Sequence, residues 1–136
     1  MKTTARANKW LCFVFFSIVT ATPTFSQSDE IVLKQRANAM HEALKSSDEN
    51  DWKVYIKANY SKKMIEKYDM SRHIEMFERL HKDFSDSQIS SLEVKNDKVL
   101  MEIERNNDKH LVTFDISYDA TDDYKFNGFS IEAGEL

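Results

Sequence analysis

The first side chains to consider for chemistry in this sequence are its four histidines, His41, His73, His81 and His110. His41-Glu42 begins like a zinc-protease helix, but the second histidine expected four residues on is missing. Glu78 and His81 have the i, i+3 spacing of a di-iron ligand pair, and such sites need that motif twice together with two more glutamates. The motif occurs once. We therefore expect no dedicated metal site and no cofactor.

An acidic turn contains Asp119, Asp122 and Asp123. Carboxylates are the ligands that calcium prefers, but this stretch lacks the 12-residue ligand spacing and central glycine of an EF-hand loop. We expect a solvated turn here and not a calcium site.

A second candidate site consists of polar and aromatic side chains that the hydrophobic pattern turns inward: Trp52, Tyr55, His73 and Tyr118. They predict a small pocket. A histidine acting in proton transfer needs a partner, and Asp115 alternates out of phase with Phe114, so it points away from the interior. We expect one hydrogen bond to satisfy His73 and packing to account for the aromatic rings, and we assign no catalytic residue.

The charges are unevenly distributed along the chain. Residues 27–84 hold 11 basic and 11 acidic side chains, whereas residues 85–136 hold 5 and 12. The carboxylates predicted to share the outer face of a sheet are Glu93, Glu102, Glu104 and Asp115. Two interpretations remain open: a solvated surface, or a face that docks a basic partner.

The whole chain has 136 residues, a net charge of −4, one cysteine, one proline and two glycines. This length corresponds to one domain, and one cysteine excludes a disulfide scaffold or a cysteine-based metal centre. The acidic balance argues against nucleic acids and anionic membranes, which bind clustered lysine and arginine. The sequence does not define an oligomeric state beyond a monomer or a homodimer.

Residues 1–26 resemble a secretory signal peptide. Lys2, Arg6 and Lys9 precede an apolar run over residues 10–19, and small or polar residues with Pro23 follow it. The run is about half the roughly 20 apolar residues that span a bilayer. The pattern predicts cleavage after Ser26 and export to the periplasm or beyond, with an uncleaved N-terminal anchor as the alternative. Residues 27–136 then form the single folded domain, which no longer contacts a membrane.

The elements that must position these side chains fall into two halves. Apolar residues recur at helical spacing over residues 29–46, in a short segment around Trp52 and Tyr55, in another capped by Ser61, and from Ser71 to about Phe84. Ser28 is the expected cap of the first helix and Ser71 that of the fourth.

Beyond Ser85 the period changes to two, which predicts strands over residues 89–95, 99–105, 110–118 and 124–133. The short connections are rich in Asn and Asp, residues that tolerate a left-handed backbone. Short connections imply an antiparallel meander. The predicted fold is α+β, with N-terminal helices packed on one face of a curved four-stranded antiparallel sheet, a cone-shaped roll.

Two stretches carry a family resemblance: residues 51–61, Asp-Trp-Lys-Val-Tyr-Ile-Lys-Ala-Asn-Tyr-Ser, and residues 77–84, Phe-Glu-Arg-Leu-His-Lys-Asp-Phe. With the order of helices before strands, they resemble the nuclear-transport-factor-2-like superfamily, and in particular the small domain found ahead of secreted bacterial serine hydrolases and peptidases. The chain departs from that pattern at Asp86-Ser87, where the family usually has glycine, and it lacks the Ser-x-x-Lys stretch of a hydrolase.

The resemblance implies an exported, non-catalytic binding or accessory module for a small ligand or a protein. Two alternatives stay open. One is a small pocket enzyme of isomerase, dehydratase or hydrolase type, which phenylalanines filling the cone would argue against. The other is a stand-alone accessory domain that partners a serine hydrolase.

Overall fold

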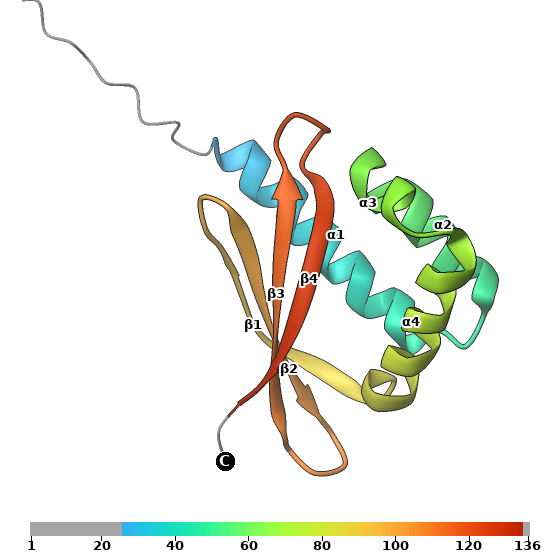
Figure 1. Cartoon of the computed structure of the whole chain (residues 1–136). Helices are drawn as coiled ribbons and strands as arrows, with labels where there is room; N and C mark the ends of the chain where they lie inside the picture. Colours follow the sequence, from blue (N-terminus) through green and yellow to red (C-terminus); the bar gives the residue numbers. More distant parts are fainter. Residues whose placement is uncertain (1–25, 135–136) are drawn as a thin grey trace, which may run out of the picture.

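The computed structural model describes residues 26–134, in which four helices precede four strands (Figure 1). The helices are α1 (Gln27–Lys45), α2 (Glu49–Asn59), α3 (Lys62–Lys67) and α4 (Met70–Phe84). The strands are β1 (Ser87–Val94), β2 (Lys98–Arg105), β3 (Leu111–Asp119) and β4 (Lys125–Ala133). This arrangement confirms the predicted α+β class. Apart from Ser26, the predicted signal peptide lies outside the described residues.

The strands form one antiparallel sheet in the order β1-β2-β3-β4, which is the predicted meander and is not closed into a barrel. The register shifts in two of the three strand pairs. In the β1–β2 pair the shift lies between Ile89 and Ser91, and in the β3–β4 pair it lies between Ser117 and Tyr118. Because Ser117 pairs with Gly128 and Tyr118 pairs with Phe126, Asn127 is the extra residue of a bulge in β4. A bulge changes the direction in which the side chain of the extra residue, Asn127, points.

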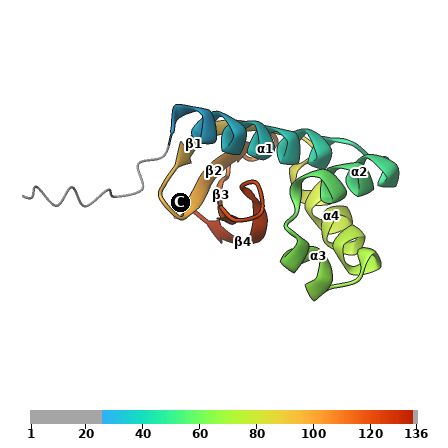
Figure 2. The same ribbon diagram turned by 90° about the horizontal axis from the view of Figure 1, so that it is seen from above.

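The helices cover one face of the curved sheet. Figure 2 shows α1 lying across that face, with α2, α3 and α4 grouped beside the β4 edge. The space between helices and sheet is filled by aromatic and aliphatic side chains. Phe84 and Phe114 pack edge to face with ring centroids 5.1 Å apart, and Phe114 stacks on Phe129 at 6.3 Å. Together with the buried Phe77, these phenylalanines fill the space between helices and sheet, the arrangement that argues against the pocket-enzyme alternative.

Two of the predicted helix caps are wrong by two residues. The cap of α1 is Ser26, not Ser28: its hydroxyl accepts from the Asp29 amide, and the Asp29 carboxylate accepts from the Ser26 amide. The cap of α4 is Asp69, not Ser71, and it accepts from the Arg72 amide at 2.9 Å. Both errors have one cause, since each start offers two capping residues two positions apart and only the packing of the helix selects one.

The cap of α3 is Ser61, as predicted. The turns differ in part from expectation. Within residues 26–134 the residues with positive φ are Lys109, Asp123 and Tyr124, so only one of the three is an Asp or Asn. The other two residues have hydrogen bonds of different kinds. The Lys109 amide donates to the Arg105 carbonyl at 2.9 Å, and the side-chain hydroxyl of Tyr124 donates to Asp29 at 3.0 Å.

Candidate functional site

Three of the four predicted pocket residues lie around one buried phenylalanine of α4. The Trp52 ring is 6.3 Å from Phe77, and the Tyr55 ring is 5.5 Å from it. His73 joins the same cluster through Tyr60, whose ring is 5.3 Å from His73 and 6.4 Å from Phe77. The cluster is a tightly packed aromatic layer between α2 and α4.

Tyr118 lies elsewhere, at the end of β3. Its hydroxyl donates to the Lys95 carbonyl at 3.0 Å, and its ring packs on Tyr124 at 5.8 Å. Burial, helped by the nearby Asp97, raises the pKa of Tyr118 to about 12. Tyr118 therefore lies beside the turn that connects β1 and β2, and its hydroxyl stays protonated there.

Trp52 has a structural part in this cluster. Its indole nitrogen donates to the carbonyls of Ala43 and Ser46, each at 3.0 Å. These carbonyls lie at the C-terminal end of α1, where helix carbonyls lack partners within the helix. The ring thus ties the start of α2 to the end of α1.

Tyr55 is buried, and its hydroxyl has no hydrogen-bond partner in the part of the chain described. Burial, together with the neighbouring Tyr60, raises its pKa well above 10. Its residue also borders an open groove of about 520 Å³ between α1 and α2, next to Ala43 and the exposed Val54. Tyr55 and His73 therefore belong to different hollows of the surface.

His73 lines the more enclosed of these hollows, between α3, α4 and β4. We call it the edge pocket; it measures about 290 Å³ and is lined by Tyr60, Met64, Lys67, Tyr68, Arg72, His73, Met76, Asn127, Gly128 and Phe129. Only 6% of His73 is exposed, and its Nε2 atom has no hydrogen-bond partner among residues 26–134. We expected one hydrogen bond to satisfy this histidine, and on this nitrogen the structure shows none.

The charge state of His73 follows from its surroundings. Burial lowers its pKa below 6.5, against the opposing pull of the Met64, Tyr68 and Ile65 backbone and of the Asp69 carboxylate. The imidazole is thus neutral at pH 7. A neutral, buried and unpartnered ring nitrogen is costly unless something binds it.

Two cations that precede His73 in sequence, Lys67 and Arg72, also line the edge pocket. Lys67 Nζ lies 5.3 Å from the centroid of the Tyr68 ring, and Arg72 Cζ lies 5.6 Å from the same centroid. The ring face attracts both cations and limits where they can move. Sequence reasoning missed them because they are exposed residues on α3 and α4 without a motif.

Asn127 supplies a further polar group from β4. Its side-chain oxygen accepts from the Ser61 hydroxyl at 2.9 Å, while the Ser61 amide donates to the Phe126 carbonyl at 2.8 Å. The bulge at Asn127 allows the side chain to reach across to the start of α3. No pattern in the sequence marks this bulge.

The predicted acidic face is on the outer side of the sheet, and two of its members are paired with lysines. Asp115 lies 2.9 Å from Lys98 Nζ, and Glu104 lies 3.5 Å from Lys109 Nζ. The hydrogen bond to Asp115 raises the pKa of Lys98, which keeps that lysine charged. The face is therefore less negative than its carboxylates alone suggest.

The other two members of the acidic face differ from each other. Glu102 accepts from the Ser90 hydroxyl across the β1–β2 pair at 2.5 Å, while Glu93 is exposed on the edge strand β1. Mixed pairing of this kind is typical of a solvated surface, which was one of the two interpretations left open.

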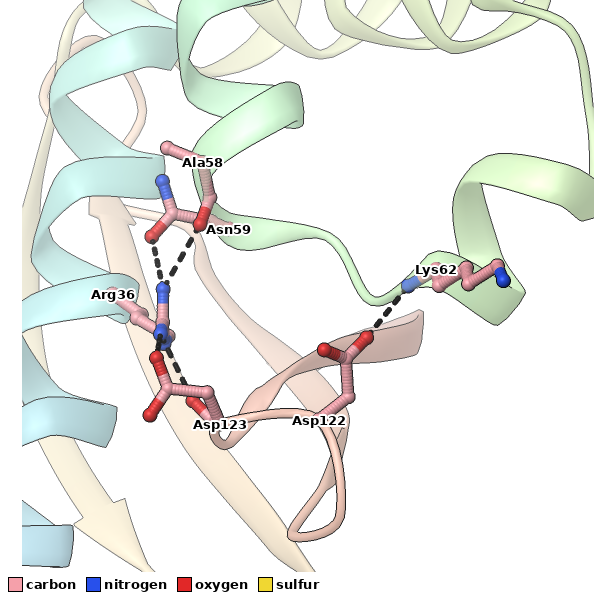
Figure 3. Close-up of polar contacts among 6 residues, drawn as sticks. All are labelled: Arg36, Ala58, Asn59, Lys62, Asp122 and Asp123. Atoms are coloured by element: carbon pink, nitrogen blue, oxygen red, sulfur yellow. Dashed lines mark hydrogen bonds and ion pairs between the residues drawn. The ribbon is translucent and has the colours of Figure 1, made fainter.

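Arg36 of α1 forms the most connected polar contact, which the sequence did not predict. Figure 3 shows its guanidinium between the end of α2 and the β3–β4 turn. Nη1 donates to the Ala58 carbonyl and to Asn59 Oδ1, both at 3.1 Å. Nη2 donates to the Asp123 carbonyl at 2.9 Å and to its carboxylate at 3.3 Å. We call this set the arginine clamp.

A second contact of the β3–β4 turn is visible in the same view. The carboxylate of Asp122 accepts from the Lys62 amide at 2.7 Å, at the first residue of α3 (Figure 3). The acidic turn thus holds two helices in place, and its carboxylates are occupied by protein partners.

His41 and Ser87 form a buried pair between α1 and β1, with His41 Nε2 3.0 Å from Ser87 Oγ. Ser87 donates its single proton to the Phe84 carbonyl, so the histidine is the donor in this pair. A nucleophilic serine would instead give its proton to the histidine. The pair therefore supports the β1 start, and burial, with Lys45 nearby, lowers the pKa of His41.

Residues 26–134 contain neither a cluster of metal-ligating side chains nor a membrane-spanning helix. No group of three His, Cys, Asp or Glu side chains lies close enough together to hold a metal ion. No helix in this range is long and apolar enough to cross a membrane.

The fold and the site together define a small α+β protein in which helices cover one face of an open antiparallel sheet and a basic, aromatic pocket lies at the sheet edge. Comparisons of the chain with family models, curated proteins and solved structures found no significant match.

Proposed function

We propose that the chain is an exported, non-catalytic binding module of the nuclear-transport-factor-2-like type, and that the edge pocket is where it holds a small ligand. The observation that carries this proposal is a pocket of about 290 Å³ whose lining includes the buried His73, a histidine with an unpartnered Nε2. Ligand pockets start at about 300 Å³, and they combine apolar walls with a few polar groups. The edge pocket has this composition.

Two further observations favour binding over the enzymatic alternative. Phenylalanines fill the interior in which a catalytic cavity would have to lie. No carboxylate is among the lining residues of the edge pocket, so His73 has no acidic partner there for proton transfer. Export is supported by the signal-like leader in the sequence alone.

The test is to fill the pocket and follow binding by NMR. Amide resonances are recorded while a set of small aromatic and aliphatic acids, amides and amines is added. We expect at least one compound to shift the resonances of Met64, His73 and Phe129. Met76 is 43% exposed and lines the edge pocket, so Met76→Trp should abolish these shifts.

The matched control is Val54→Trp, which adds the same ring at an exposed position in the groove between α1 and α2. This variant should bind as the parent does. Binding that survives Met76→Trp, or that Val54→Trp removes, would contradict the proposal.

A further inference from the structure

The edge pocket is a basic region of an acidic chain. Its lining residues include Lys67, Arg72 and His73 and no aspartate or glutamate. Residues 27–136 as a whole carry 16 basic and 23 acidic side chains. The positive character of the pocket is therefore local, and it does not follow from composition.

The two cations at the rim have no charged partner. Nine ion pairs are formed within residues 26–134, and neither Lys67 nor Arg72 takes part in any of them. Both instead lie against one ring, that of Tyr68. A ring face attracts a cation without neutralising it, and two cations on one ring repel each other. A bound anion near these cations would offset that repulsion.

The cationic and amide groups that line the pocket also favour a ligand that accepts hydrogen bonds. Guanidinium and ammonium groups donate and cannot accept. Asn127 uses its side-chain oxygen to accept from Ser61, so its NH2 group is the end that Ser61 does not engage. A ligand that satisfies these groups must supply acceptors. The remaining wall, which includes Met64, Met76 and Phe129, is apolar and suits a hydrophobic body.

We infer that the edge pocket selects small organic anions, a carboxylate attached to an aromatic or aliphatic body, with Lys67 and Arg72 as the residues that set the preference for negative charge. The inference rests on the proposed function and adds the ligand class to it. Charge-assisted hydrogen bonds to a carboxylate are stronger than those to a neutral amide, so the preference should be measurable.

The experiment compares three probes of one shape: 2-naphthoate, 2-naphthamide and 2-naphthylmethylamine. Dissociation constants are measured by calorimetry and by NMR titration on the full domain at low salt. We expect 2-naphthoate to bind about tenfold or more tightly than the amide, and the amine to bind weakest. Lys67→Gln/Arg72→Gln should remove the advantage of the acid and leave the affinity for the amide nearly unchanged.

Lys63→Gln is the matched control, because it removes a charge from the same short helix at an exposed position that does not line the pocket. It should leave all three affinities close to those of the parent. Equal binding of acid and amide, or an equal loss in Lys63→Gln, would overturn the charge preference while the proposed function stands. If no probe shifts pocket resonances, the inferred ligand class is overturned, and the wider compound set then decides the proposed function.

Discussion

Arg36 in α1 and Asp123 in the β3–β4 turn are 87 positions apart in sequence, and the arginine donates to both the carbonyl and the carboxylate of the aspartate. The side chain of Arg36 is 13% exposed, whereas that of Asp123 is 82% exposed. The carbonyl contacts of the arginine clamp therefore matter more for stability than the solvated carboxylate contact.

This asymmetry gives a first prediction. Arg36→Met should lower the free energy of unfolding by about 2 to 4 kcal/mol, because it leaves the Ala58 and Asp123 carbonyls without their donor. Asp123→Asn should cost less than about 1 kcal/mol, since asparagine tolerates the positive φ of 53° and keeps the carbonyl. Urea denaturation of both variants measures the two values. Equal losses would contradict the assignment.

The caps give a second prediction. Asp69→Ala should destabilise the protein by about 1 kcal/mol, because the Arg72 amide at the start of α4 loses its acceptor. Ser71→Ala should change stability by less than about 0.5 kcal/mol, since Ser71 lies inside the helix and is exposed. The pair separates the observed cap from the one that the sequence predicted. A larger loss in Ser71→Ala would reverse the assignment.

The buried histidines give a third prediction, for stability against pH. Burial lowers the pKa of both His41 and His73 below 6.5 in the folded state. As the pH falls below 6.5, the unfolded chain takes up protons that the folded chain does not, so the free energy of unfolding decreases. This loss should begin well above the pH at which carboxylates are protonated.

The measurement is chemical denaturation at intervals between pH 7.5 and pH 5. His41→Gln/His73→Gln should give a flatter profile than the parent over this range, whatever its absolute stability. Each single variant should fall between the two. An unchanged slope in the double variant would show that other groups carry the dependence.

Binding of an anion to the edge pocket should depend on pH in the opposite sense, which is a fourth prediction. A bound carboxylate favours the protonated form of His73, so binding is coupled to proton uptake and tightens as the pH falls from about 7.5 to 5.5. The charged groups around His73 are Lys67 of α3, Asp69 at the cap of α4, and Arg72 of α4, and the lining residues from β4 do not titrate.

His73→Gln should remove most of this pH dependence while 2-naphthoate still binds through the two cations. The readout is the dissociation constant of 2-naphthoate at each pH, with the amide probe as a reference for changes that do not involve charge. A pH dependence of equal size in His73→Gln would exclude the histidine as its source.

Much of the fold could be predicted because each half of the chain follows one period. The spacing of Val99, Met101 and Ile103 at every second position defines one strand, and all three apolar residues are buried. The change of period after Ser85 located the boundary between helices and sheet to within two residues of β1. The alternation of apolar residues was enough to predict the strands, because a sheet with one buried face fixes which residues of each strand point inward.

The site was less predictable, because its parts depend on contacts between distant elements. His73 was found because it lies on the apolar stripe of its helix. Lys67, Arg72 and Asn127 are each ordinary surface residues in sequence, and only the packing of α3, α4 and the β4 bulge brings them to one pocket. Arg36 was missed for the same reason, as both of its main partners are far along the chain.

The capping box of α1 would link cleavage of the predicted leader to the stability of the domain. Removal of the predicted leader after Ser26 would delete the hydroxyl that accepts from the Asp29 amide, and would place a protonated amino group at the positive end of the helix. The Asp29 carboxylate accepts from the Ser26 amide and from the Tyr124 hydroxyl, and only the Tyr124 contact would remain. The precursor should then be more stable than its product by about 1 kcal/mol, and a cut one residue earlier would avoid that loss.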